Sequence, residues 1–274
     1  MPARDGELVA DLALLEEAVR EAGHIARRFF GGAFKRWSKD KGSPVTEADL
    51  EIDAFLTDRL RSARRDYGWL SEETDDDASR LTAARTFVVD PIDGTIAFVR
   101  GKPHFTICAG VIAEGRPIAG VVYNPISEDC FRAGVGLGAA LNGKAIRVGE
   151  RVDVEGCRML ADKAMLEHPA WSKAPNVPWP PMQIESRNSI ALRMALVAGG
   201  EFDAMLALSP KHDWDLAAAE IIVLEAGGAV TTHTGDMLHY NGAAPIQPSV
   251  VSAGPGLHAN LLSRLRHLKL PGGA

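Results

Sequence analysis

Two aspartates three positions apart, Asp90 and Asp93, give the strongest chemical signal in the sequence. They lie in residues 90–95 (Asp-Pro-Ile-Asp-Gly-Thr), directly after the apolar run 87–89. A backbone restricted by proline and released by glycine can turn both carboxylates and the carbonyl between them toward one point. Oxygen ligands of this kind suit Mg²⁺. Asp-Pro and Asp-Gly are also common turn pairs, so these residues alone leave a metal site and a plain turn both open.

Three further acidic positions have the same two interpretations. Glu72 follows a short apolar step but also begins an acidic run that a solvated surface explains. Asp49 and Asp215 each fall at the start of a predicted helix, where a carboxylate commonly caps the first turn. Taken singly, each position is explained by a structural role. Their order along the chain, however, matches the order of motifs in a known family.

Four segments, in this order, resemble the motifs of the inositol monophosphatase family of Mg²⁺-dependent, lithium-sensitive phosphatases. They are residues 43–49, 68–73, 90–95 and 213–218. The matching stretch spans about residues 36 to 228. The resemblance implies a mixed α+β and α/β fold, the layered αβαβα sandwich of the inositol monophosphatase and fructose-1,6-bisphosphatase type. It also implies a homodimer.

The resemblance further implies a role for individual residues. The ligands of two or three Mg²⁺ ions are expected to be Glu72, Asp90, the main-chain carbonyl of Ile92, Asp93 and Asp215. Asp49 and Thr95, with Glu72, are expected to be catalytic, the first two orienting the attacking water. The backbone amides of Gly94 and Thr95 are expected to cradle the phosphate, as helix N-termini often do. Arg187 or Asn188 and Lys211 are the substrate-side candidates.

The substrate is less well defined than the reaction. Inositol-specific members carry an acidic residue seven positions before the last metal aspartate, and Leu208 stands there. Residues 209–212 (Ser-Pro-Lys-His) are similar to the 3'(2'),5'-bisphosphate nucleotidase branch, so Lys211 either meets a second phosphate or is a solvated lysine. Inositol monophosphate and 3'-phosphoadenosine 5'-phosphate are the two main candidates. Histidinol phosphate or a sugar phosphate is an alternative, and a catalytically silent metal-binding regulatory protein is the alternative from another class.

Hydrophobic periodicity predicts the elements that must position these residues. Helices are expected at 6–30, 47–63, 189–199 and 213–226, and strands at 87–89, 106–112, 118–123 and 250–252. The middle strands are expected to form an antiparallel meander. Near residues 145–155 the predicted pattern changes from helices and a meander to alternating strands and helices. We therefore expect an N-terminal α+β subdomain, 1–148, that carries most metal ligands. A C-terminal α/β subdomain, 149–274, would carry Asp215 and the substrate-side residues.

Composition excludes several classes of protein. The 274 residues carry 30 Lys+Arg against 36 Asp+Glu, a net charge of −6, and 46% are apolar, so the chain is not disordered as a whole. Without a basic run, a nucleic-acid polymer is not an expected partner. The family resemblance implies a small phosphorylated metabolite as partner. Cys108, Cys130 and Cys157 form no paired motif, which indicates a reducing, cytoplasmic location. No apolar stretch approaches a membrane span of ~20 residues, and the amphipathic N-terminus is unlike a signal peptide.

Overall fold

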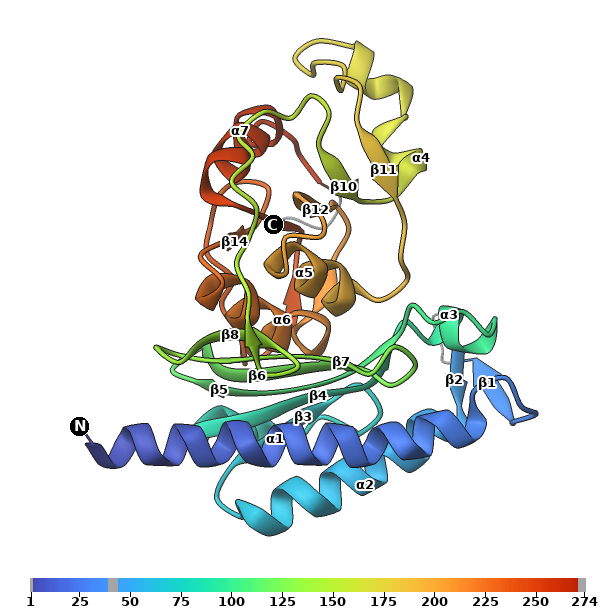
Figure 1. The fold of residues 1–274 in the computed structure, drawn as a ribbon, viewed down its shortest axis with the longest axis vertical. Coiled ribbons are helices and arrows are strands. Elements are labelled where there is room, and N and C mark those ends of the chain that lie inside the picture. The colour runs from blue at the N-terminus through green and yellow to red at the C-terminus, as the bar shows by residue number, and fades with distance from the viewer. Residues whose placement is uncertain (1, 39–43, 271–274) are drawn as a thin grey trace.

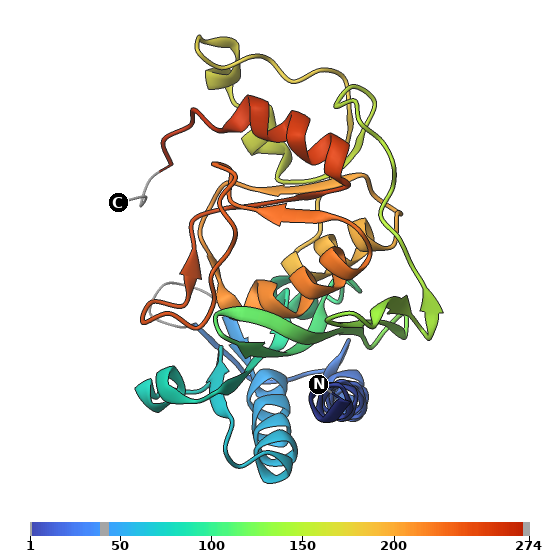
Figure 2. The same cartoon turned by 90° about the vertical axis from the view of Figure 1, so that its left-hand side faces the viewer.

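Five layers of helix and sheet stack on one another in the computed structural model, which describes residues 2–38 and 44–270. Two helices lie under a seven-stranded sheet, two more separate it from a five-stranded sheet, and further helices cover the outer face (Figures 1 and 2). This αβαβα order confirms the predicted fold. Ser43, the first residue of one motif, lies outside the described residues.

The first layer consists of α1 (Pro2–Phe29) and α2 (Glu47–Ala63). Leu15, Val19 and Ala22 of α1 are fully buried against the sheet, as their three- and four-residue spacing predicts. A short antiparallel ladder of β1 (Arg36–Ser38) and β2 (Pro44–Thr46) leads into α2. The N-cap of α2 is Thr46, which forms a capping box with Asp49.

The seven-stranded sheet carries the hexapeptide at the end of its second strand. Its strands, in spatial order, are β3 (Gly68–Ser71), β4 (Arg85–Asp93), β5 (Thr106–Ala113), β6 (Arg116–Asn124), β7 (Asp129–Gly134), β8 (Gly138–Leu141) and β9 (Lys144–Ala145). The strands from β4 to β9 are antiparallel, which confirms the predicted meander, whereas β3 pairs in parallel with β4. The parallel pair places the end of β3, just before Glu72, beside β4.

The C-terminal half builds the second sheet and its helices. Its strands, in spatial order, are β11 (Gln183–Glu185), β10 (Arg158–Leu160), β12 (Ala204–Ala207), β16 (Val250–Ala253) and β14 (Ala229–Thr231). A separate ladder joins β13 (Lys211–His212) to β15 (Ile246–Gln247). The α-helices are α4 (Lys163–Leu166), α5 (Ile190–Ala198), α6 (Asp213–Glu225) and α7 (Pro255–Leu265). Two 3₁₀ turns, Ala78–Thr82 and Pro169–Ser172, complete the elements.

Helix α6 lies unusually close to the seven-stranded sheet because Gly120 has no side chain. A Cβ atom at Gly120 would lie 2.4 Å from the carbonyl oxygen of Ala218. The surrounding alanines and leucines of α5 and α6 are buried in one apolar cluster between the two sheets. This packing fixes the start of α6, and therefore Asp215, over the end of β4. Among the described residues, no helix combines the length and apolarity needed to cross a bilayer.

Candidate metal-binding active site

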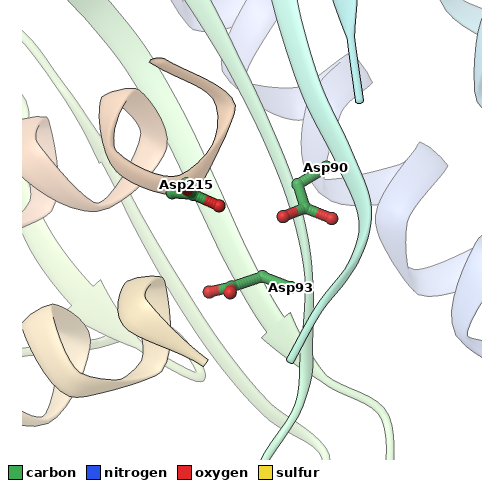
Figure 3. A group of neighbouring side chains, drawn as sticks. All are labelled: Asp90, Asp93 and Asp215. Carbon is green, nitrogen blue, oxygen red and sulfur yellow. The ribbon is translucent and has the colours of Figure 1, made fainter. Parts of the chain in front are cut away.

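Three aspartates converge where β4 ends and α6 begins. Asp90 and Asp93 come from β4 and Asp215 from the first turn of α6, and Figure 3 shows their carboxylates facing one another. One carboxylate oxygen from each lies within 4.8 Å of the others. Asp90 and Asp93 are buried. The two sequence motifs that supply these acids, residues 90–95 and 213–218, are therefore brought to one point.

Local backbone irregularities aim the β4 side chains. The pairing of β4 with β5 shifts register between Asp90 and Asp93, which is a β-bulge at Pro91 and Ile92. A bulge re-aims side chains that regular alternation would send to fixed faces of the sheet. Gly94 then turns the chain with a φ of 97°, and α3 (Thr95–Val99) begins. Pro91 therefore lies in the bulge, and Gly94 forms the turn that follows it.

The protein orients Asp90 and Asp215 through one oxygen each. Asp90 Oδ1 accepts a hydrogen bond from the amide of Ile92 at 3.0 Å, and Asp215 Oδ2 accepts one from the amide of His212 at 2.8 Å. Asp90 Oδ2 is buried without a hydrogen-bond partner in the described residues. An unpartnered buried carboxylate oxygen is costly and is typical of a site whose ligand is a cation.

Asp93 is anchored across the layers of the fold. Its carboxylate accepts hydrogen bonds from the Ser189 hydroxyl at 2.6 Å, the Ala191 amide at 2.7 Å and the Ile190 amide at 3.2 Å. All three donors belong to the start of α5. The N-terminus of a helix from the C-terminal half therefore fixes a carboxylate of the N-terminal half.

Burial and mutual repulsion make the acidic cluster a strong base. Burial raises the pKa of Asp93 to about 6, against the hydrogen bonds from α5, which lower it. The pKa values of Asp90 and Asp215 are raised well above the usual aspartate value, first by burial and then by neighbouring carboxylates. A divalent cation removes this penalty because it pairs with all three charges. The all-oxygen donor set and the unpartnered Asp90 Oδ2 fit Mg²⁺.

Asp49 and Thr95 lie beside this cluster. The Thr95 hydroxyl is 3.0 Å from the carbonyl oxygen of Ile92 and 3.4 Å from Asp49 Oδ1. The other carboxylate oxygen of Asp49 is held by the amide of Thr46 at 2.8 Å. Burial raises the pKa of Asp49 to about 6, which the bonds from Thr46 oppose. A hydroxyl, a carboxylate and a main-chain carbonyl are thus assembled next to the candidate metal ligands.

A cavity of about 180 Å³ opens at the acidic cluster. Its walls come from both halves of the chain. They are formed by Pro44, Glu72, Asp90, Ile92, Asp93, Gly94, Thr95, Ile96, Asn188 and Asp215. The candidate metal ligands and both phosphate-cradle residues share this one cavity, while Asp49 reaches it through Thr95.

The substrate-side candidates have mixed positions. Arg187 forms an ion pair with Glu185 at 2.7 Å, and the neighbouring Asn188, not Arg187, lines the cavity. Lys211 Nζ donates to Ser209 Oγ at 2.8 Å and to the carbonyl of Pro210 at 3.0 Å. The roles of Arg187 and Lys211 in binding substrate stay predictions.

Sequence reasoning missed two residues here, Ser189 and Arg193. Ser189 before an apolar run signals a helix N-cap, but its bond to Asp93 joins residues 96 positions apart, which local patterns do not reveal. Arg193 Nε donates to the carbonyl of Arg187 at 2.6 Å and holds the turn that leads to Asn188. Its position four residues after Ser189 on one helix face is the only local signal.

Known proteins resemble this chain over most of its length. The sequence profile described as the inositol monophosphatase family matches residues 8–269. Inositol monophosphatase 2 of Solanum lycopersicum is 33% identical over 238 residues, which cover 84% of this chain and 89% of that protein. Nus factor SuhB of Xylella fastidiosa is 30% identical over 228 residues, covering 81% and 82%.

The fold also matches that of a solved structure. The IMPase of Thermotoga maritima superposes with a TM-score of 0.77 at 27% identity, covering 97% of each chain. The profile match extends over nearly the whole chain and includes every residue of the acidic cluster. The chain therefore belongs to the inositol monophosphatase family.

Proposed function

We propose that the protein is a Mg²⁺-dependent phosphomonoesterase that hydrolyses small phosphate esters with water. One observation carries the proposal: three oriented carboxylates, one with an unpartnered buried oxygen, line one cavity with Thr95, whose hydroxyl lies 3.4 Å from the carboxylate of Asp49. A protein that only binds metal has no need of that pair. Membership of a phosphatase family supports the same reaction class.

The residues of the chain divide the work of hydrolysis. Asp90, Asp93 and Asp215, with Glu72 and the carbonyl of Ile92, would hold two or three Mg²⁺ ions. Bound Mg²⁺ supplies charge neutralisation on the phosphate oxygens and lowers the pKa of coordinated water. The main chain at Gly94 and Thr95, which lines the cavity, receives the phosphate.

The Thr95 hydroxyl, next to Asp49, orients the attacking water. Asp49 accepts the proton that this water loses. A carboxylate with a pKa near 6 is a suitable base at neutral pH. The water oxygen bonds to phosphorus, the ester P–O bond breaks, and the leaving oxygen takes a proton from solvent to give the free alcohol.

Two substrates are supported by different observations. Inositol monophosphate is supported by the relative named an inositol monophosphatase. 3'-Phosphoadenosine 5'-phosphate is supported by two partly buried cations, Lys211 and Arg193, which have no carboxylate within 4.0 Å among the described residues. Burial lowers the pKa of both groups, and Arg193 lowers that of Lys211 further, whereas nearby carboxylates, Asp93 among them, oppose both shifts. A second anionic group on the substrate would pair with such cations.

A regulatory role is the competing function. It is favoured by the relative named Nus factor SuhB, and metal binding without turnover would be its signature. We further propose a cytoplasmic homodimer. Three buried free cysteines are compatible with a reducing compartment, and the dimer rests on the family resemblance.

A substrate panel tests the proposal. Purified protein with Mg²⁺ is assayed for phosphate release from inositol monophosphate, 3'-phosphoadenosine 5'-phosphate, histidinol phosphate and sugar phosphates. We expect release from at least one of the first two. If the protein binds metal but releases phosphate from none of these substrates, the regulatory function replaces the phosphatase function.

A further inference from the structure

Ser189 is a fully buried serine whose hydroxyl serves two elements at once. As the N-cap of α5, its Oγ accepts a hydrogen bond from the amide of Leu192 at 2.9 Å. The same oxygen lies 2.6 Å from Asp93 Oδ2. An ordinary N-cap serine needs only the first contact. The second contact links helix capping to a candidate metal ligand.

The direction of the protons in this group follows from counting donors. A serine hydroxyl has one proton, and an ionised carboxylate has none to give. The Ser189 proton therefore goes to Asp93, which leaves Ser189 Oγ as the acceptor from Leu192 and from Thr106 Oγ1 at 3.0 Å. The resulting hydrogen-bond chain runs from Thr106 through Ser189 to Asp93.

The lone pairs of Asp93 are also accounted for. A carboxylate has about four acceptor positions, two on each oxygen. Oδ2 accepts from Ser189 and from Ala191 at 2.7 Å, whereas Oδ1 accepts only from Ile190 at 3.2 Å. Oδ1 is thus the oxygen that retains an acceptor position for a cation.

Tight packing keeps this arrangement from relaxing. A Cβ atom at Gly94 would lie 3.0 Å from the amide nitrogen and 3.2 Å from the Cβ of Ser189. The turn after Asp93 is therefore seated directly on the start of α5. Close packing of this kind leaves little room for either segment to shift.

We propose that Ser189 is a positioning residue of the metal site, which turns Asp93 so that it binds the cation through Oδ1 alone. In this way a hydroxyl from the C-terminal half of the chain influences how tightly the metal site binds its cation through Asp93. The inference rests on the metal site of the proposed function but not on any substrate.

The test separates this role from helix capping. Ser189→Gly removes the hydroxyl but costs an N-cap only a few tenths of a kcal/mol. Ser189→Ala removes both the hydroxyl and the cap, and Ser189→Thr keeps the hydroxyl. Ser252→Ala is the matched control, because Ser252 is a fully buried serine whose hydroxyl has no hydrogen-bond partner in the described residues.

Binding of Mn²⁺ to the metal-free full-length protein is measured by electron paramagnetic resonance, without substrate, and folding is checked by circular dichroism and urea unfolding. We expect Mn²⁺ to bind about 10- to 100-fold more weakly to folded Ser189→Gly and Ser189→Ala. Ser189→Thr should restore binding and Ser252→Ala should leave it unchanged. Folded Ser189→Gly that binds Mn²⁺ within twofold of wild type would overturn the proposal, whether or not Ser189→Thr folds. Because the experiment measures metal binding and not turnover, its result can be interpreted even if the protein does not catalyse the proposed reaction.

Discussion

Thr95 places its hydroxyl 3.4 Å from the carboxylate of Asp49, joining the start of α3 to the first turn of α2. The two residues are 46 positions apart, and each is also held by its own main-chain neighbours. In the proposed reaction, this pair beside the acidic cluster would take a proton from the attacking water.

Removing either member of this pair should slow chemistry without releasing the metal. We expect Thr95→Ala and Asp49→Asn to lower kcat by about 10²–10⁴-fold, the usual contribution of a general base. Thr95→Ser keeps the hydroxyl and should retain most activity. Steady-state kinetics with a parallel Mn²⁺ titration make the measurement. Loss of metal binding in Thr95→Ala would show that the pair is structural.

The acidic cluster should destabilise the metal-free protein at neutral pH. The pKa of folded Asp90 lies well above its unfolded value, so the folded state holds the extra proton as pH rises from about 4. The free energy of unfolding that Asp90 contributes therefore falls with rising pH. Neutral Asp90→Asn should be more stable than wild type by ~1–3 kcal/mol at pH 7.5 in EDTA, and less so at pH 5.

Urea unfolding of both proteins at the two pH values, with and without Mg²⁺, measures this effect. Added Mg²⁺ should stabilise wild type more at pH 7.5 than at pH 5, because it displaces protons from the carboxylates. An Asp90→Asn variant less stable than wild type at pH 7.5 in EDTA would contradict the repulsion that burial implies.

Gly94 should not tolerate a side chain. A Cβ atom there would lie 2.9 Å from the carbonyl oxygen of His104, in addition to its contacts with Ser189. Gly101 also has a positive φ, of 64°, but nothing within 4 Å of a Cβ. Gly94→Ala should therefore cost about 2 kcal/mol more stability than Gly101→Ala, as measured by urea unfolding. Equal losses would mean that the packing of Gly94 on α5 is loose.

Much of this architecture was accessible from the sequence because local signals were strong. Apolar periodicity predicted α2 over its observed range, 47–63. The antiparallel meander expected for the middle strands includes the observed β5–β6 pairing. The parallel pairing of β3 with β4 was not predicted, since pairing between strands depends on contacts that neither segment encodes by itself.

The same limit applies to the site. The residue types at positions 90–95 indicated metal chemistry, and the structure brings Asp90, Asp93 and Asp215 together. The anchoring of Asp93 by Ser189 depends on how α5 docks on the sheet, and no spacing along the chain records it. Substrate choice depends on side chains such as Lys211, whose position is set by long-range packing as well.

Lys211 should discriminate between the two candidate substrates. Lys211→Met keeps the apolar stem but removes the charge, and Lys163→Met removes an exposed charge on α4 as a control. We expect kcat/KM for 3'-phosphoadenosine 5'-phosphate to fall about 10- to 100-fold in Lys211→Met, with inositol monophosphate unaffected. Equal effects on both substrates, or none, would remove Lys211 from the binding site.

The dependence of phosphate release on Mg²⁺ and on Asp93 tests the central claim most directly. Wild type is assayed on the preferred substrate with Mg²⁺ and with EDTA, beside Asp93→Asn with Mg²⁺. We predict release only by wild type with Mg²⁺, and a loss of more than about 100-fold in Asp93→Asn that remains folded, since metal stabilisation of the transition state is worth several kcal/mol. Release that persists in EDTA or in Asp93→Asn would contradict the account.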